Sequence, residues 1–214
     1  MIDNYKKLRI KKYYELQDID LKDREEIDIQ VEILSILSDM TEDEIMDLPL
    51  PEYQKLVKAS SFLSTSPTPT KNIPQYIIIN GTKYRVLSDI KEFKTGQYID
   101  YNNYLKMDKN IPYVLSTLLI PYNKTYGDYN IMKTIEDISN HLSIIDALSL
   151  SAFFLRKCQS LTKATVIYLA WKLKRMAKKE KNPMVKEKMM KAVAEMNTLK
   201  TSIKDGDFLI GLYK

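Results

Sequence analysis

A single Asn-Gly pair sets the first constraint on this chain. Two runs rich in β-branched and aromatic residues, 75–79 and 82–87, flank Asn80 and Gly81. A type I′ turn needs positive φ at both central residues, and Asn-Gly meets that need at low cost. The pattern therefore predicts a β-hairpin. Because an isolated hairpin is marginal in water, this one must pack on helices or add to the edge of another sheet.

The segments before the hairpin have the apolar spacing of amphipathic helices. Residues 8–16 are predicted as an extended stretch that leads into a helical turn. Ile27, Val31 and Leu34 recur on one face, which predicts a core-facing helix over about 25–40. Thr41 and Glu44 have capping-box spacing, so a short helix is expected over 42–47. Pro51 can open a third helix, which we predict over 52–63.

After the hairpin, the same spacing returns. Helices are predicted over 96–106, 112–120, 132–140 and 144–161, with a tyrosine-rich loop at 121–130. When the helices on the two sides of the hairpin are compared, Phe62 aligns with Phe154 and Leu56 aligns with Leu148. Either the chain contains an internal duplication, or these are two amphipathic helices of the kind that always align at this level.

The expected fold class is mainly α with a small β-hairpin. Three prolines among small polar residues mark 64–74 as a linker or extended arm. The arm and the hairpin would join two related helical units, followed by basic carboxyl-terminal helices. The predicted divisions are an acidic helical unit at 1–63, the Pro-rich linker and hairpin at 64–92, a second helical unit at 93–161, and basic Met-rich helices with an apolar tail at 162–214.

Charge is distributed unevenly along the chain. Residues 15–55 contain fourteen Asp and Glu against three Lys and Arg, whereas residues 156–204 contain fourteen Lys and Arg against three acidic residues. Such a chain can fold its basic end onto its acidic end, repeat that pairing between subunits, or offer each patch to a separate partner. Two solvated helix faces are the simplest alternative.

The basic region begins with a predicted helix that runs to about Lys181 and is ended by Pro183. Its apolar residues, Tyr168 and Trp171 among them, are expected to face a core. Its cations cluster near the helix end, where the macrodipole favours positive charge. They are also candidate phosphate contacts if the region binds nucleic acid. These candidates are Lys172, Lys174, Arg175, Lys178 and Lys179.

A second apolar pattern follows, with the 4-3-4-3-4 spacing of a coiled-coil seam. The candidate partner seam consists of Val185, Met189, Ala192, Met196, Leu199 and Ile203. It must be buried, either against the same chain or against another subunit. Methionine adapts to irregular partners, although it fills ordinary cores as well. The apolar tail at 206–213 is expected to dock into a groove of this chain or of a neighbour.

Composition argues against several classes of protein. The chain has one cysteine and one histidine, so it cannot form a Cys/His metal cage or a disulfide within itself. We expect no cofactor and no metal. Its five glycines form no phosphate-binding loop and no nucleophile elbow. Without a signal peptide or an apolar run of membrane-spanning length, the protein is expected to be soluble and intracellular.

Individual residues add little chemistry. His141 is predicted at a helix junction without a partner nucleophile, and Cys158 is predicted on an amphipathic helix as an inert thiol. The acidic run at 18–28 lacks the glycine and the final glutamate of a calcium loop. We therefore predict no catalytic residue, and the sequence favours a protein that is not an enzyme.

Three phrases resemble small tail or virion-associated proteins of tailed phages: 7–16, 31–37 and 41–49. The segment from Gly96 to Leu155 is similar in style. The likeness is to proteins of crAss-like phages of Bacteroides and to helical tail assembly chaperones. It covers about residues 7–155 and is one of pattern, with no invariant motif. It implies a small non-enzymatic protein that stays in the particle or helps to assemble the tail.

The leading hypothesis is therefore a non-enzymatic phage virion protein, either tail-associated or packaged as cargo. It would act through contacts with portal, tail or ring components and with copies of itself. Its location would be the virion, and the host cytoplasm during assembly. The alternatives are a tail assembly chaperone and a nucleic-acid-binding accessory protein, with an unrecognised enzyme as a further class.

Overall fold

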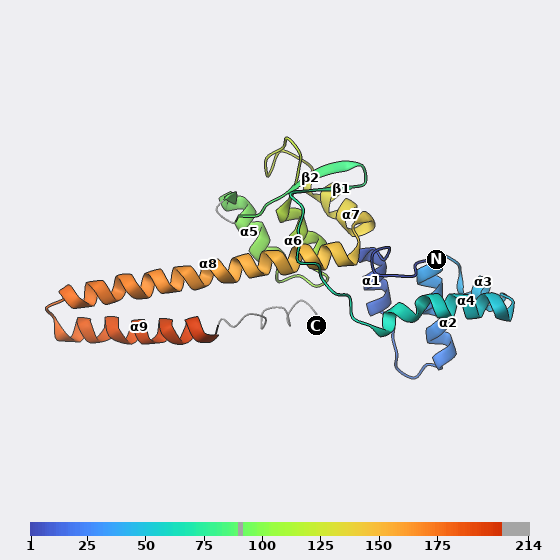
Figure 1. The fold of residues 1–214 in the computed structure, drawn as a ribbon, viewed down its shortest axis with the longest axis horizontal. Coiled ribbons are helices and arrows are strands. Elements are labelled where there is room, and N and C mark those ends of the chain that lie inside the picture. Colours follow the sequence, from blue (N-terminus) through green and yellow to red (C-terminus); the bar gives the residue numbers. More distant parts are fainter. Residues whose placement is uncertain (90–91, 203–214) are drawn as a thin grey trace. The chain divides into compact units, whose positions relative to one another are not determined.

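The computed structural model describes residues 1–89 and 92–202. The chain is mainly helical with a small antiparallel sheet, which confirms the expected fold class (Figure 1). It divides into two compact units. The first unit comprises Met1–Leu87 and Lys91–Ser151, and the second comprises Ser88–Ile90 and Ala152–Lys214. The internal duplication and the four sequence segments stay predictions.

The first unit begins with four α-helices and one turn of 3-10 helix. These are α1 (Ile10–Gln17), α2 (Glu26–Ser38), α3 (Glu42–Met46), α4 (Leu50–Ser60) and η1 (Ser61–Ser64). Before α1, Arg9 is extended and pairs with Ser143, while the amide of Ile144 donates to the carbonyl of Leu8 at 2.8 Å. The predicted extended lead-in to a helix is therefore confirmed.

Helices α2, α3 and α4 enclose a small apolar cluster. Val31, Leu34 and Ile45 are buried in it, and Leu56 of α4 packs against them. The predicted capping box starts α3, because the Thr41 hydroxyl accepts from the Glu44 amide and the Glu44 carboxylate accepts from the Thr41 amide. Ile27, however, is 43% exposed, so its predicted core placement is wrong. It lies in the first turn of α2, ahead of the buried positions of that helix.

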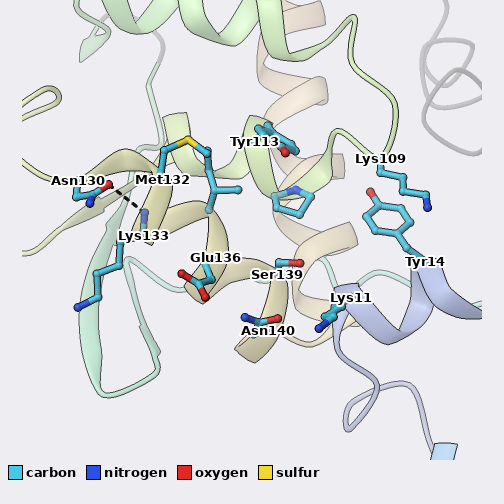
Figure 2. A pocket seen from close by; sticks show the side chains of 12 residues that line it. Lys11, Tyr14, Lys109, Tyr113, Asn130, Met132, Lys133, Glu136, Ser139 and Asn140 are labelled. Atoms are coloured by element: carbon cyan, nitrogen blue, oxygen red, sulfur yellow. Dashed lines mark hydrogen bonds between the residues drawn. The ribbon is translucent and has the colours of Figure 1, made fainter. Parts of the chain in front are cut away.

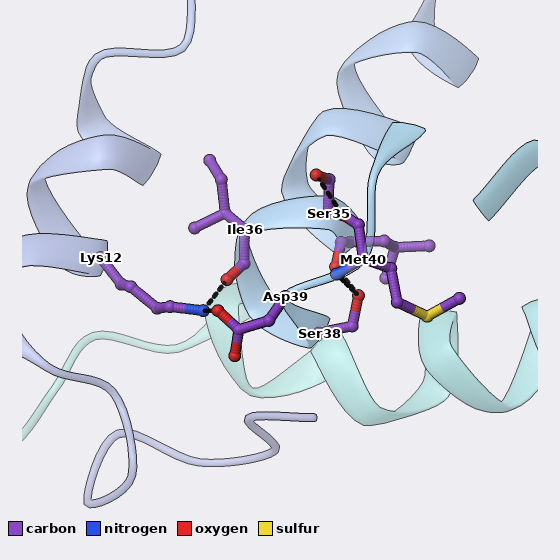
Figure 3. Close-up of polar contacts among 7 residues, drawn as sticks. Lys12, Ser35, Ile36, Ser38, Asp39 and Met40 are labelled. Carbon is purple, nitrogen blue, oxygen red and sulfur yellow. Dashed lines mark hydrogen bonds and ion pairs between the residues drawn. The ribbon is translucent and has the colours of Figure 1, made fainter. Parts of the chain in front are cut away.

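A lysine from α1 contacts the carboxyl end of α2 (Figure 3). The ammonium of Lys12 donates to the Ile36 carbonyl and to the Asp39 carboxylate, each at 2.5 Å. Asp39 has a φ of 62°, the left-handed conformation that ends the helix. The free carbonyls at a helix carboxyl end carry partial negative charge, so the ammonium is well placed there. This contact links α1 to α2.

The predicted hairpin is confirmed. Strands β1 (Tyr76–Ile79) and β2 (Thr82–Val86) are antiparallel around Asn80 and Gly81, whose φ values are 48° and 74°. The Asn80 amide donates to the Asp137 carboxylate at 2.8 Å, and this bond ties the turn to helix α7 (Ile131–His141). The hairpin thus obtains the helical support that it needs.

A third strand was not predicted. Helix α6 (Ile111–Leu118) leads directly into β3 (Leu119–Pro121), which pairs with β2 and gives the sheet order β1-β2-β3. The expected helix to residue 120 is therefore wrong at its end. A residue before proline avoids the α conformation, which favours an extended Ile120. The open edge of β2 provides hydrogen-bond partners for that stretch.

Helix α6 is the centre of the first unit. It contacts α7 and α5 (Thr95–Tyr104), and Leu115 on it is fully buried. Two tyrosines of the loop before α7 are tied to these helices: the Tyr126 hydroxyl donates to the Asp100 carboxylate at 2.7 Å, and the Tyr129 hydroxyl donates to the Ser116 carbonyl at 3.4 Å. Burial, first of all, raises the pKa of both phenols.

The second unit consists mainly of two long helices. Helix α8 (Ile144–Lys179) begins in the first unit and continues into the second, and α9 (Pro183–Ser202) follows after three residues. The sequence divided α8 into two overlapping segments, but residues 144–182 contain no glycine or proline to interrupt it. Over the part of the chain that the structure describes, no helix has the length and apolar content required to cross a membrane.

Candidate interaction surface

Helices α8 and α9 form an antiparallel hairpin within the second unit (Figure 1). The three-residue connection requires adjacent, oppositely directed helices. Asn182 caps α9, because its side-chain oxygen accepts from the amides of Met184 at 3.0 Å and Val185 at 3.4 Å. Pro183 therefore opens α9 as its first residue. We name this two-helix element the helical hairpin.

Among the described side chains of residues 166–198, the buried ones form a narrow stripe. On α8 this stripe contains Ala170 and Ala177, which are 7% and 1% exposed, and on α9 it contains Val193 at 7%. Val166 and Leu173 are half-buried on the same side of α8, so the buried positions recur at spacings of 4, 3 and 4. This spacing follows one side of a helix, as in a coiled-coil seam.

The candidate partner seam lies partly on this stripe. Met189, Ala192 and Met196 are half-buried, and Val185 is 37% exposed. The Leu199 side chain and Ile203 lie outside the described parts of the structure. The sequence missed Val193, the most buried of the described side chains of α9, which follows Met189 at the other permitted helical spacing. Use of the seam by another subunit stays a prediction.

The sequence placed several residues of α8 wrongly in a core. Tyr168 and Trp171 are each 55% exposed, and Ile167, Leu169 and Met176 are also exposed. A helix with apolar residues around much of its circumference needs neighbours on several sides to bury them. Between residues 166 and 179 of α8, the buried residues Ala170 and Ala177 lie on one side of the helix.

The exposed side of α8 combines aromatic rings with cations. The ring centroids of Tyr168 and Trp171 are 6.2 Å apart, and the Arg175 guanidinium lies 5.5 Å from the Trp171 centroid. Lys172 and Lys179 are exposed on the same side. We name these five residues the cationic-aromatic face. Its positions follow one another at the i, i+3 and i+4 spacings that bring side chains together on a helix.

All five candidate phosphate contacts are exposed. Three of them, Lys172, Arg175 and Lys179, belong to the cationic-aromatic face, while Lys174 and Lys178 lie beside it. Contact with phosphate itself stays a prediction.

The first unit has an exposed surface of opposite charge. Residues 42–52 contain five acidic residues and no basic one, and all five are exposed: Glu42, Asp43, Glu44, Asp47 and Glu52. Two apolar side chains among them, Met46 and Leu50, are 65% and 66% exposed. We name this region, at the junction of α3 and α4, the acidic corner. The Thr41 amide lowers the pKa of the Glu44 carboxyl by donating to it.

A groove of about 760 Å³ lies among α1, α6 and α7 (Figure 2). The hydroxyl of Tyr14 accepts from the Ile111 amide at 3.3 Å, and burial raises its pKa to about 12. Lys109 pairs with Asp18, and Asn130 caps α7. These polar groups already serve neighbouring elements, so the groove is a weaker candidate site than the charged surfaces.

The sequence predicted no catalytic role for His141 or for Cys158, and this stays a prediction. His141 is exposed at the last position of α7, the helix junction that was predicted. Cys158 belongs to α8, and its side chain lies outside the described part of the structure. Within residues 1–89 and 92–202, no three His, Cys, Asp or Glu side chains gather as a metal site would require.

Comparisons with known proteins add no assignment. No protein-family model matches the chain, and neither the curated proteins nor the solved structures contain a significant match. The likeness to phage proteins therefore stays a prediction that rests on sequence pattern.

Proposed function

We propose that this chain is a non-enzymatic phage virion protein, tail-associated or packaged as cargo, that acts through protein–protein contacts. Its partners are other virion proteins such as portal, tail or ring components, and copies of itself. It functions in the virion and passes through the host cytoplasm during assembly. The helical hairpin and the acidic corner are the surfaces that make these contacts.

One observation carries the proposal: the cationic-aromatic face exposes large apolar rings on a regular helix. Trp171 and Tyr168 are each 55% exposed. Large aromatic residues and arginine are the types that most often dominate the binding energy of protein interfaces. Trp171 and Arg175 lie together here, 5.5 Å apart, on an ordered scaffold. This arrangement supports a binding surface.

The test is quantitative mass spectrometry of purified particles, with the major capsid protein as the internal reference. We expect the chain at a reproducible copy number that survives repeated gradient purification. If the chain is abundant in infected cells and missing from mature particles, a tail assembly chaperone replaces the proposed role. Particles from cells that express the chain with Trp171→Ala and Tyr168→Ala should contain less of it.

A nucleic-acid-binding accessory protein is the second candidate, because the aromatic rings are exposed among lysines and not buried as the sequence indicated. Aromatic rings between cations can stack on bases while the cations neutralise phosphates. The test is a salt titration of binding to single-stranded and duplex DNA. A steep fall in affinity with salt, reduced by Lys172→Gln and Lys179→Gln, supports this role. An affinity that does not respond to salt rejects it.

A further inference from the structure

We infer that the cationic-aromatic face of α8 docks on the acidic corner of a second copy of the chain. The inference rests on the proposed function and deepens it by naming one partner. Two surfaces on the same polypeptide, one cationic and one acidic, are then the two sides of a single repeated contact.

Charge is the first argument. Residues 167–179 contain five cations and no acidic residue, whereas residues 42–52 contain five acidic residues and no cation. Among the ion pairs of the described residues, none includes any of these ten side chains. Opposite potentials of this kind steer two surfaces together and set their register.

Apolar surface is the second argument. The acidic corner exposes Met46 and Leu50, and the cationic-aromatic face exposes Trp171. Each surface therefore has an apolar centre within charged surroundings, which is the usual composition of a protein interface. A thioether side chain such as Met46 also packs well at the edge of an aromatic ring.

The same features disfavour other self-contacts. Two cationic-aromatic faces would bring six positive charges together, and two acidic corners would bring together ten negative ones. Like charges placed opposite each other across an interface are costly. The favoured contact therefore joins different surfaces of the two copies. A contact of that type forms a ring if its rotation closes and an open chain of subunits if it does not.

The first experiment is analytical ultracentrifugation of the full chain over a range of concentrations, at about 50 mM and about 500 mM salt. We expect self-association at low salt that weakens by about tenfold or more at high salt, because screening acts on exposed charges. Trp171 is the only tryptophan, so its fluorescence reports directly on the docking face. Its emission should shift to shorter wavelength as the concentration rises.

The second experiment uses charge reversal. The hairpin variant changes the helical hairpin and carries Lys172→Glu, Arg175→Glu and Lys179→Glu. The corner variant changes the acidic corner and carries Asp43→Lys, Asp47→Lys and Glu52→Lys. Each should weaken self-association by about tenfold or more. An equimolar mixture of the two should associate, because each retains one native surface. A chain with all six changes should associate again, since its charges are exchanged.

A matched control reverses three exposed lysines of the first unit, Lys58→Glu, Lys106→Glu and Lys124→Glu. It should associate like the unaltered chain. Circular dichroism checks that every variant keeps its helix content. If a reversal variant loses helix, Lys172→Gln with Arg175→Gln and Lys179→Gln replaces it.

Three results would overturn the inference. If the chain stays monomeric at every concentration and salt level, the cationic-aromatic face binds a different partner or the acidic corner of the same chain. If self-association does not depend on salt, or if the chain with all six changes does not associate, the copies use a different interface. DNA binding by a strictly monomeric chain assigns the face to nucleic acid. A monomer that is nonetheless found in purified particles removes this inference and leaves the proposed function standing.

Discussion

Leu34 and Leu115 of the first unit are fully buried, whereas Tyr168 and Trp171 of the second unit are each more than half exposed. All four belong to helices with an apolar side. The difference is how much of each helix is covered, because α6 contacts α5, α7 and β3, while the buried residues of α8 between 166 and 179, Ala170 and Ala177, lie on one side of that helix. An apolar helical residue is thus a core residue in one unit and a surface residue in the other.

The largest expected effect tests the core side of this comparison. Leu34→Ala removes a fully buried side chain from the cluster of α2, α3 and α4, and should destabilise the first unit by about 2–5 kcal/mol. Trp171→Ala, at an exposed position, should change stability by no more than about 0.5 kcal/mol. Chemical denaturation followed by circular dichroism measures both. Equal losses would show that the two positions do not differ in burial.

A charge within the narrow stripe should disrupt the helical hairpin of the second unit and leave the first unit folded. Val193→Asp places a carboxylate at a position that is only 7% exposed, so the helical hairpin should open while the first unit stays folded. An isolated helix of this length is marginal in water, and α9 should lose its amide protection. Hydrogen exchange with mass spectrometry resolves the two regions. Thr198→Asp, at an exposed position of α9, is the control.

A smaller effect is expected at the helix that begins the acidic corner. Thr41→Ala removes the hydroxyl that accepts from the Glu44 amide and should cost about 1 kcal/mol, whereas Thr41→Ser should cost less. Thermal or denaturant unfolding of the three proteins ranks them. If the serine variant is as unstable as the alanine variant, the hydroxyl contact is not what stabilises α3.

The smallest effect concerns acid. The Thr41 amide lowers the pKa of Glu44 in the folded chain below its ordinary value of 4.5. The contribution is therefore complete above that value and is lost as the pH falls through the lowered folded pKa. Glu44→Gln should remove this part of the acid dependence, because it loses the carboxylate's contribution at neutral pH and leaves the stability at low pH nearly unchanged. Unfolding curves between about pH 2 and pH 6 provide the comparison.

Local sequence signals predicted those structural elements whose formation depends on one short stretch of the chain. Asn80-Gly81 specified its turn, and Thr41 with Glu44 specified the start of α3. Strand β3 depends on the open edge of β2, more than thirty residues earlier in the chain, so helical spacing over 112–120 could not reveal it. Ile120 before Pro121 was the one local sign against a longer helix.

The sequence predicted the charge of the candidate surface but not which of its side chains are exposed. The five cations at 167–179 and the five acidic residues at 42–52 can be counted directly in the sequence. The exposure of Tyr168 and Trp171 cannot, because periodicity shows which residues share a side of a helix and not whether a neighbour covers that side. For residues 166–179 of α8, the burial of individual side chains in the structure supplies that information.

The turn of the β-hairpin also has a consequence for how the molecule ages. Because glycine follows Asn80, the Gly81 backbone nitrogen can slowly attack the side-chain amide carbon of Asn80 and release ammonia. Water then opens the resulting cyclic imide and leaves a carboxylate. Here that amide donates to Asp137, which is 7% exposed, so the new carboxylate would face an existing one in a poorly solvated place. Peptide mapping of stored protein would detect the change. Protein stored for a long time would then contain a destabilised β-hairpin. The Asn-Gly turn that forms the sheet would therefore also limit how long the sheet stays intact.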